Sequence, residues 1–255
     1  MMIWPLGLLL GIMVSQQVRW QRLFAAEGEV LSQQAELELQ KQTLQVQLLK
    51  NLPALGFQNL FHDWTFLQFL QYFGNWDHRQ LTGYDLADDY FEVMVERDPY
   101  HFDAYIFMSS TLSIYVGQPD RAVELQKLGL ESLTPEVPPE AYFIWRQVGI
   151  DQILFLDDIT GAIESHEMAA QWAAQSPDPR GEEDQFSLQK TADFLKTDPD
   201  NTSVQVNAWL QVLSSSVYEE TQAIAIANIE ALGYELQPVN DGYMARPKSA
   251  PTSDE

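Results

Sequence analysis

The fold is decided by a stretch that begins ADDYFEVMVERDP at Ala87 and recurs in outline twice further along the chain. The second copy is AVELQKLGLESLTP from Ala122, and the third is AIESHEMAAQWAAQSP from Ala162. In each copy a small residue opens an amphipathic segment, and a proline closes it. The copies start 35 and 40 residues apart, close to the period of about 34 residues at which stacked helix pairs recur. The stretch therefore predicts a stack of helix pairs.

Aromatic-rich segments between the copies supply the other helix of each pair. The pattern predicts helices over residues 102–115 and 120–133, then over 142–155 and 159–175. Residues 53–177 are thus expected to form the repeats, and residues 178–237 a further helical extension. From residue 238 to residue 255 the chain is rich in Pro, Gly, Ser and charge, which predicts a disordered tail. No segment shows the alternation expected of a strand.

The order of Tyr105, Ser109, Gly117, Ala122 and Pro135 resembles the tetratricopeptide repeat, and Trp145, Gly149, Ala162 and Pro177 follow the same order more loosely. The resemblance implies an all-α fold, a right-handed α-solenoid of helix hairpins that binds another protein. The segment from Gly56 to Gly74 also looks like membrane-anchored bacterial repeat proteins, and the Gln-rich, Lys-poor composition looks cyanobacterial. That likeness implies, by analogy alone, a role in assembling a membrane complex such as a photosynthetic one.

The N-terminus carries a membrane signal of intermediate length. Residues 1–14 are uncharged and largely apolar, and Arg19 and Arg22 follow them. A membrane-spanning helix needs about 20 apolar residues, and this run is shorter. Residues 1–24 are therefore expected to be an anchor that either spans the bilayer or lies in its interface. A cleaved signal peptide fits less well, because the positive charge follows the apolar run instead of preceding it, and a soluble helix is the remaining alternative. The two arginines favour a cytoplasmic main domain, with a periplasmic or lumenal one as the alternative.

Residues 25–52 are expected to form a stalk helix. Val30, Leu37 and Leu44 recur every seven residues, but Gln34 and Lys41 occupy the positions between them and only Leu48 fits. This is a poor coiled-coil seam, so a solvated stalk is favoured. The next segment, residues 57–74, is the most aromatic in the chain. Its apolar side chains cover nearly every face, which favours core packing, with a partner or lipid contact as the alternative.

Composition excludes several classes of function. The chain has 37 acidic and 14 basic residues, a net charge of −23 and no cysteine. A field of that sign repels nucleic-acid phosphates, and thiol chemistry is impossible without cysteine. No phosphate-binding loop, nucleophile elbow or zinc-type histidine pair is present. The sequence therefore predicts no enzyme, no cofactor, no metal and no small-molecule substrate.

These features together predict an acidic, membrane-anchored scaffold that binds protein partners as an assembly or stabilisation factor. The alternative is a structural subunit of a membrane complex that uses the aromatic helix 57–73 as a permanent interface. The residues expected to contact a partner are Arg146, Met108, Leu112, Trp64 and Phe69. Arg146 is favoured most, because a cation in so acidic a chain is either paired internally or directed at a ligand carboxylate.

Overall fold

The computed structural model of the chain describes residues 4–197, 199–215, 219–239 and 242–248, with side chains from Gly28 onward except those of Ser215 and Glu220. Helices make up 72% of it, which confirms the prediction of a mostly helical chain. Within the described ranges the elements are α1 (Trp4–Asn51), α2 (Gln58–Gly74), α3 (Trp76–Thr82), α4 (Ala87–Arg97), α5 (Phe102–Ser109), the π-helix η1 (Ser110–Val116), α6 (Pro119–Leu130), α7 (Tyr142–Leu154), α8 (Ile159–Ala173), α9 (Gly181–Leu195), α10 (Thr202–Ser215), α11 (Glu219–Ala231), β1 (Tyr234–Val239) and β2 (Gly242–Pro247).

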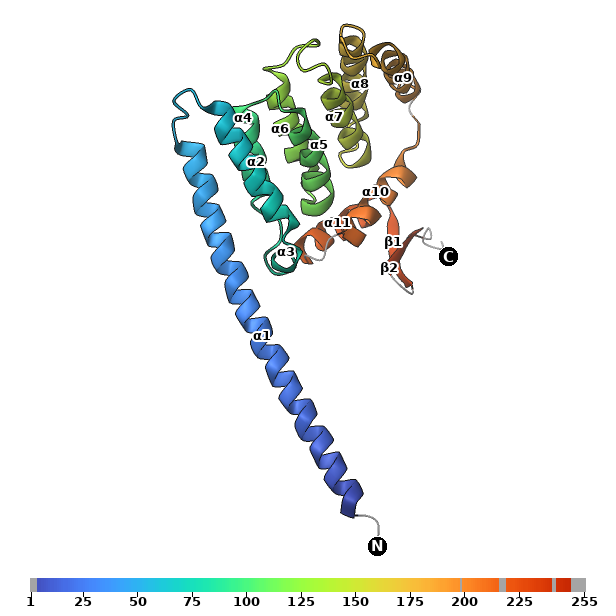
Figure 1. Ribbon diagram of the computed structural model, residues 1–255. Helices are drawn as coiled ribbons and strands as arrows, with labels where there is room; N and C mark the ends of the chain where they lie inside the picture. The colour runs from blue at the N-terminus through green and yellow to red at the C-terminus, as the bar shows by residue number, and fades with distance from the viewer. Residues whose placement is uncertain (1–3, 198, 216–218, 240–241, 249–255) are drawn as a thin grey trace, which may run out of the picture.

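Helices α2 and α4 to α9 stand side by side in a row, and α3 lies at the lower end of α2 (Figure 1). α2 packs on α4, α6 packs on η1 and α7, α8 packs on α7, and α9 continues the row beyond α8. The α10–α11 pair lies below this row, where α10 contacts η1 and α7. The predicted helix boundaries of the repeats agree with these elements to within a few residues. Residues 76–82 form the short helix α3, whose start is capped by the Asn75 side chain.

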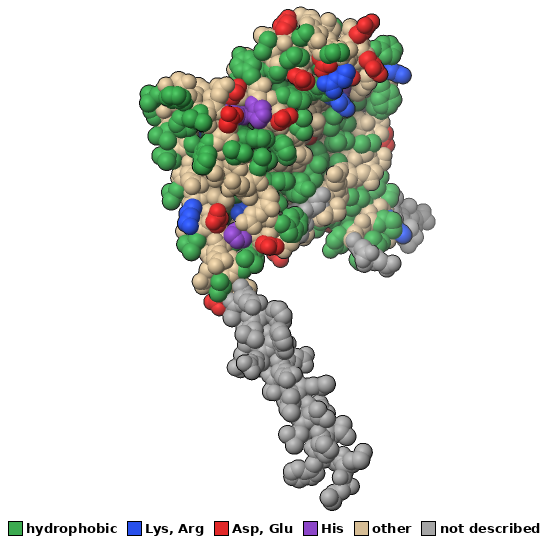
Figure 2. All heavy atoms as spheres, in the orientation of Figure 1, with side chains coloured by type: hydrophobic (Ala, Val, Ile, Leu, Met, Phe, Trp, Pro, Cys, Tyr) green, Lys and Arg blue, Asp and Glu red, His purple; other side chains and the backbone are tan. Residues whose placement is uncertain are grey.

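The main core is continuous from the end of α1 through α2, α4, α5, η1 and α6 to α7. The rings of Phe69 and Phe91 approach to 4.6 Å between centroids, and both side chains are fully buried. The aromatic helix α2 is two-sided. His62, Thr65, Phe69 and Tyr72 are buried, whereas Phe57, Leu60, Trp64 and Leu67 on the opposite side are each more than half exposed. We call these four exposed residues the α2 stripe. Figure 2 shows hydrophobic side chains widely spread over the face that α2 presents.

α1 is one continuous helix that projects far beyond the row (Figure 1). Only its C-terminal part packs on the body, where Ala35, Val46 and Leu49 are buried, so residues 35–49 are not the fully solvated stalk that the sequence predicts. Arg97 holds this end of α1, since its guanidinium donates to the carbonyls of Leu49 and Leu52 at 2.7 Å each. Residues 1–3 of the predicted anchor lie outside the described residues. Among those described, no helix combines the length and the apolar character needed to cross a membrane.

The C-terminal end corrects the sequence prediction of a disordered tail over residues 238–255. β1 and β2 pair antiparallel, with Leu236 opposite Ala245, and both residues pack against the small core around Trp209 on α10. The correction covers the described residues up to Lys248, and residues 249–255 lie outside them.

Two glycines allow neighbouring helices to approach closely. Gly129 on α6 lies against the ring and hydroxyl of Tyr105 on α5, and Gly149 on α7 lies against the His166 ring on α8. A Cβ atom at either glycine would overlap those rings. The Tyr105 ring is fixed as well, because its hydroxyl donates to the Pro99 carbonyl at 2.8 Å. These contacts explain why small residues recur at the helix crossings.

Replacing Gly129 with Ala should therefore destabilise the protein by about 1–3 kcal/mol, the usual cost of overpacking a well-filled crossing. The matched control is Gly74→Ala at the end of α2, where an added Cβ meets nothing within 4 Å and the change should stay within about 0.5 kcal/mol. Urea unfolding followed by circular dichroism measures both. Equal unfolding midpoints for the two variants would contradict the packing account.

Candidate functional site

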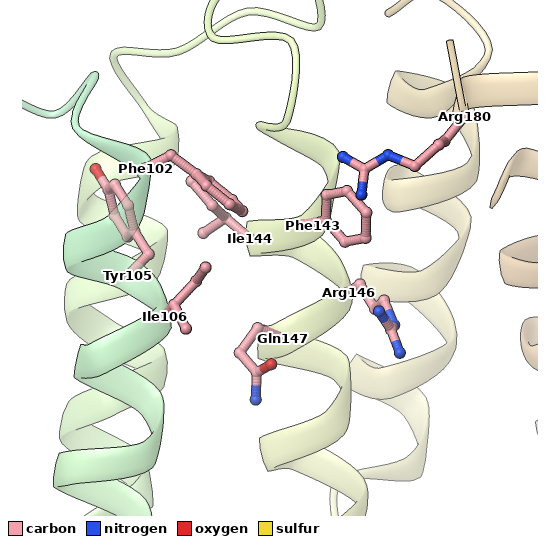
Figure 3. Close-up of a pocket in the computed structure, with 8 residues that line it drawn as sticks. All are labelled: Phe102, Tyr105, Ile106, Phe143, Ile144, Arg146, Gln147 and Arg180. Carbon is pink, nitrogen blue, oxygen red and sulfur yellow. The ribbon is translucent and has the colours of Figure 1, made fainter. Parts of the chain in front are cut away.

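The strongest candidate site is a cleft between α5 and α7, which we call the α5–α7 cleft. It encloses about 290 Å³. α5 contributes one wall, α7 contributes the other, and the segment just before α9 supplies an arginine (Figure 3). Its lining residues are Phe102, Tyr105, Ile106, Phe143, Ile144, Arg146, Gln147 and Arg180. The cleft is thus mostly aromatic and aliphatic, with two cations at one side.

Phe143 is the centre of this arrangement. Its ring stacks on that of Tyr142 at 4.3 Å between centroids, and lies 6.1 Å from the Phe102 ring across the cleft. The guanidinium groups of Arg180 and Arg146 lie 4.9 and 5.9 Å from the Phe143 ring centroid. Figure 3 shows Arg180 reaching toward this ring from one side and Arg146 on the other. Both distances allow a cation–π attraction.

The two arginines differ in their ionic partners. Arg180 donates to both carboxylate oxygens of Asp178, at 3.2 and 2.8 Å, and this bond lowers the pKa of Asp178 to about 2. Arg146 is exposed, and it forms no ion pair with any carboxylate in the described part of the chain. Its charge is therefore free to meet an anionic group from outside.

Arg146 also borders a second hollow, of about 330 Å³, between α7, α8 and α9. His166 lies in this hollow, and its pKa is lowered by burial and, to a smaller extent, by the charge of Arg146. The α5–α7 cleft and this hollow share Phe143 and Arg146. A bound segment that reaches both would therefore pass over the Arg146 guanidinium.

The structure separates the predicted partner residues into two groups. Arg146 lines the cleft, and Trp64 is exposed on α2. Met108, Leu112 and Phe69 have no exposed surface at all, which corrects the prediction that they contact a partner. All three face the helix crossings, because the inner side of each first helix is covered by the second helix of its own pair.

A buried polar network beside the cleft was not foreseen from the sequence. Asp151 on α7 is 1% exposed, and its carboxylate accepts hydrogen bonds from the Ser109 hydroxyl at 2.9 and 3.1 Å and from the Gln126 amide at 3.4 Å. Gln147, which lines the cleft, donates to the Ser109 hydroxyl at 2.8 Å. No cation pairs with Asp151 among the described residues, and burial raises its pKa to about 6, with the Ser109 and Gln126 hydrogen bonds opposing the rise.

The network lies at the edge of a cavity of about 490 Å³ between α5, η1, α7 and α10. η1 starts directly after Ser109, and a π-helical turn of this kind shifts the register of the side chains that follow. Asp151 is one of 37 acidic residues, and no local sequence pattern distinguishes it from the others. Its buried hydrogen bonds form only in the folded chain, where Ser109 and Gln126 reach it from other helices.

The histidines form a pair that their sequence positions do not suggest. His62 on α2 and His101 before α5 are 39 residues apart, and their ring nitrogens lie 2.5 Å from each other. Burial lowers the pKa of His62. Across the described residues, no cluster of three or more His, Asp or Glu side chains is placed to hold a metal ion.

No protein-family model matches this chain, and neither a curated protein nor a solved structure is detectably similar to it.

Asp151 predicts a specific pH dependence of stability. Its folded-state pKa of about 6 lies above the ordinary value of 3.8. The folded protein therefore loses stability as pH rises from about 3.8 to about 6, because the unfolded chain ionises this carboxyl more readily. The loss persists at higher pH. The Asp151→Asn variant removes this loss. It should therefore be more stable than the wild type at pH 7.5, by at most about 3 kcal/mol from the size of the shift, and the advantage should vanish near pH 4. Urea unfolding at the two pH values measures the difference.

Glu96→Gln is the matched control, because Glu96 is exposed on α4, and its profile should follow the wild type. A stability difference between Asp151→Asn and wild type that is the same at both pH values would contradict the proposed cost of burying this carboxylate.

Proposed function

We propose that this chain is a protein-binding scaffold built as a tetratricopeptide-like solenoid of helix hairpins. Its successive pairs, α2 with α4, α5 and η1 with α6, and α7 with α8, support this reading. So does Gly149, which lies where that repeat family is expected to place a small residue at a helix crossing. In such a solenoid the first helices of the pairs line the surface that receives a partner. Here those helices include α5 and α7, the walls of the α5–α7 cleft.

One observation carries the proposed binding role. In a chain of net charge −23, the exposed Arg146 has no acidic partner in the described residues and lies against Phe143 in an apolar cleft. A guanidinium placed in this way forms charge-assisted hydrogen bonds to a carboxylate, and the aromatic and aliphatic walls receive an apolar side chain. The ligand is therefore a segment of a partner protein that carries an acidic group next to an apolar residue. The role is one of binding, without catalysis.

The proposal includes a place for the scaffold at a membrane. Residues 1–24 hold it there through their apolar run, lying in the membrane interface, and Arg19 and Arg22 favour the cytoplasmic face. A scaffold held in this way meets membrane proteins during their assembly. We therefore propose a role as an assembly or stabilisation factor for a membrane protein complex.

A second candidate function rests on the α2 stripe. Phe57, Leu60, Trp64 and Leu67 are each more than half exposed along one side of α2. An apolar stripe of this kind suits a permanent interface, which would make the chain a structural subunit of a membrane complex. In that case the partner binds α2 and not the cleft.

The Arg146→Glu variant tests the two candidates. Tagged full-length protein is purified from membranes of its source cells, and co-purifying proteins are quantified by mass spectrometry. Reversing this charge should reduce recovery of the specific partners at least tenfold, because the substituted carboxylate repels the acidic segment that Arg146 attracts. Helix content measured by circular dichroism should not change, since Arg146 is exposed.

Lys127→Glu is the matched control, an equal charge reversal on the exposed surface of α6, and it should leave recovery unchanged. Full recovery with Arg146→Glu but loss with Trp64→Glu would favour the structural-subunit function instead. A bait that lacks residues 1–24 should stay in the supernatant when membranes are pelleted. If it pellets like the full chain, the anchoring part of the proposal is wrong.

A further inference from the structure

The cavity between α5, η1, α7 and α10 has the features of a ligand site separate from the α5–α7 cleft. α10 lies below the helix row and contacts η1 and α7 (Figure 1), so it gives this cavity a wall that the cleft does not have. The volume of about 490 Å³ lies within the range of about 300–1,000 Å³ that is typical of small-molecule sites. The cavity is therefore large enough to hold a small organic ligand.

Asp151 gives this cavity a single negative charge. It is the one charged residue among the described residues that line the cavity, and no cation in the described part of the chain pairs with it. A carboxylate has about four lone-pair positions. Ser109 and Gln126 donate one proton each, and the Ser113 hydroxyl, which also lines the cavity, can supply another. The carboxylate thus lacks a counter-charge and can accept a further hydrogen bond.

The other polar side chains of the cavity mostly offer acceptors. The Ser110 hydroxyl donates to backbone carbonyls one turn earlier in α5, and the Asn207 amide donates to a carbonyl one turn earlier in α10. The Gln147 amide donates to the Ser109 hydroxyl. Each of these groups engages a proton inside the protein and keeps its oxygen as an acceptor. A ligand that donates hydrogen bonds therefore fits this lining better than one that accepts them.

Apolar side chains form the rest of the lining, namely Ile106, Ile114, Ile150, Leu154, Phe155 and Val204. They favour a ligand with a hydrocarbon chain, whose surface is removed from water against them. None of the described residues that line the cavity is a lysine, arginine or histidine, so an anion finds no counter-charge there. An extended peptide would bring backbone carbonyls that need donors, and this lining has most of its donors engaged.

We propose that this cavity binds a small primary alkylammonium ion, whose cationic head donates to Asp151 and whose hydrocarbon chain lies against the aliphatic walls. The ammonium carries several N–H donors, which suit the carboxylate together with the amide oxygens of Gln147 and Asn207. A buried carboxylate without a cation costs stability, and the charge of the ligand offsets that cost. The sequence predicted no small-molecule ligand, because the residues that form this cavity come from four separate elements.

Isothermal titration calorimetry with butylammonium chloride tests the proposal on the full chain in a mild non-ionic detergent. Salt at about 0.15 M limits the loose attraction of cations to so acidic a surface, because it screens charges over about 8 Å. The wild type should bind butylammonium saturably. 1-Butanol has the same chain without the charge, and it should bind at least about tenfold more weakly.

Asp151→Asn keeps the shape of this side chain and should weaken butylammonium binding at least about tenfold, although it is expected to be the more stable protein at neutral pH. Glu96→Gln is the matched control, because it removes one charge from the exposed surface of α4, and it should bind like the wild type. Val204→Trp enlarges a cavity-lining side chain that is 46% exposed on α10, and it should block binding while Asp151 is intact.

Two kinds of result overturn the proposal. One is the absence of saturable binding to the wild type, or an affinity of Asp151→Asn or Val204→Trp equal to that of the wild type. The other is tighter binding of Nα-acetyllysine amide than of butylammonium, because the cavity would then receive a lysine side chain of a protein and not a small free amine.

Discussion

A helix pair buries only one of its sides, so each pair in this chain depends on the next to cover the other. Phe69 on α2 packs near Phe107 on α5 of the next pair, and Phe102 on α5 packs near Phe143 on α7 of the pair after it. The same dependence continues to α8, on which α9 packs. At the far end, α10 and the β1–β2 hairpin close their own small core around Trp209. At the near end no element of the described chain covers the outer side of α1, where Leu37, Leu44 and Leu48 are exposed.

The same packing rule explains which parts of the chain could be predicted. The Ala-to-Pro copies have a strong helical period and clear ends, so the paired helices from α5 to α8 follow from sequence. The identity of the buried residues does not follow as easily. Met108 and Leu112 lie on a first helix, and only the placement of the neighbouring helices shows that they face the core. The C-terminal hairpin was missed because Pro238 and the polar residues around it look like a tail. The dipeptide Asp241-Gly242 was the available signal.

Of the residues that line the α5–α7 cleft, the sequence predicted only Arg146, and it did not predict the residues around it. Arg146 could be singled out because cations are rare in so acidic a chain. Its setting against Phe143, and the ion pair that engages Arg180 but leaves Arg146 free, depend on α7 and the start of α9 coming together. Asp151 gave no sequence signal, yet its hydrogen bonds join α5, α6 and α7 beside the cleft. An exposed cation above an apolar cleft and a buried carboxylate beside it are a combination that a purely structural stack does not require.

Site-specific photocrosslinking tests the central claim most directly, namely that a protein partner binds in the α5–α7 cleft. A photoreactive amino acid is placed either at Ile106, which is 55% exposed in the cleft, or at Leu128, which is 40% exposed on α6. The chain is then irradiated in its own membranes. The account predicts a crosslinked partner from position 106 and none from position 128. A partner captured from position 128 alone, or equally from both positions, would contradict it.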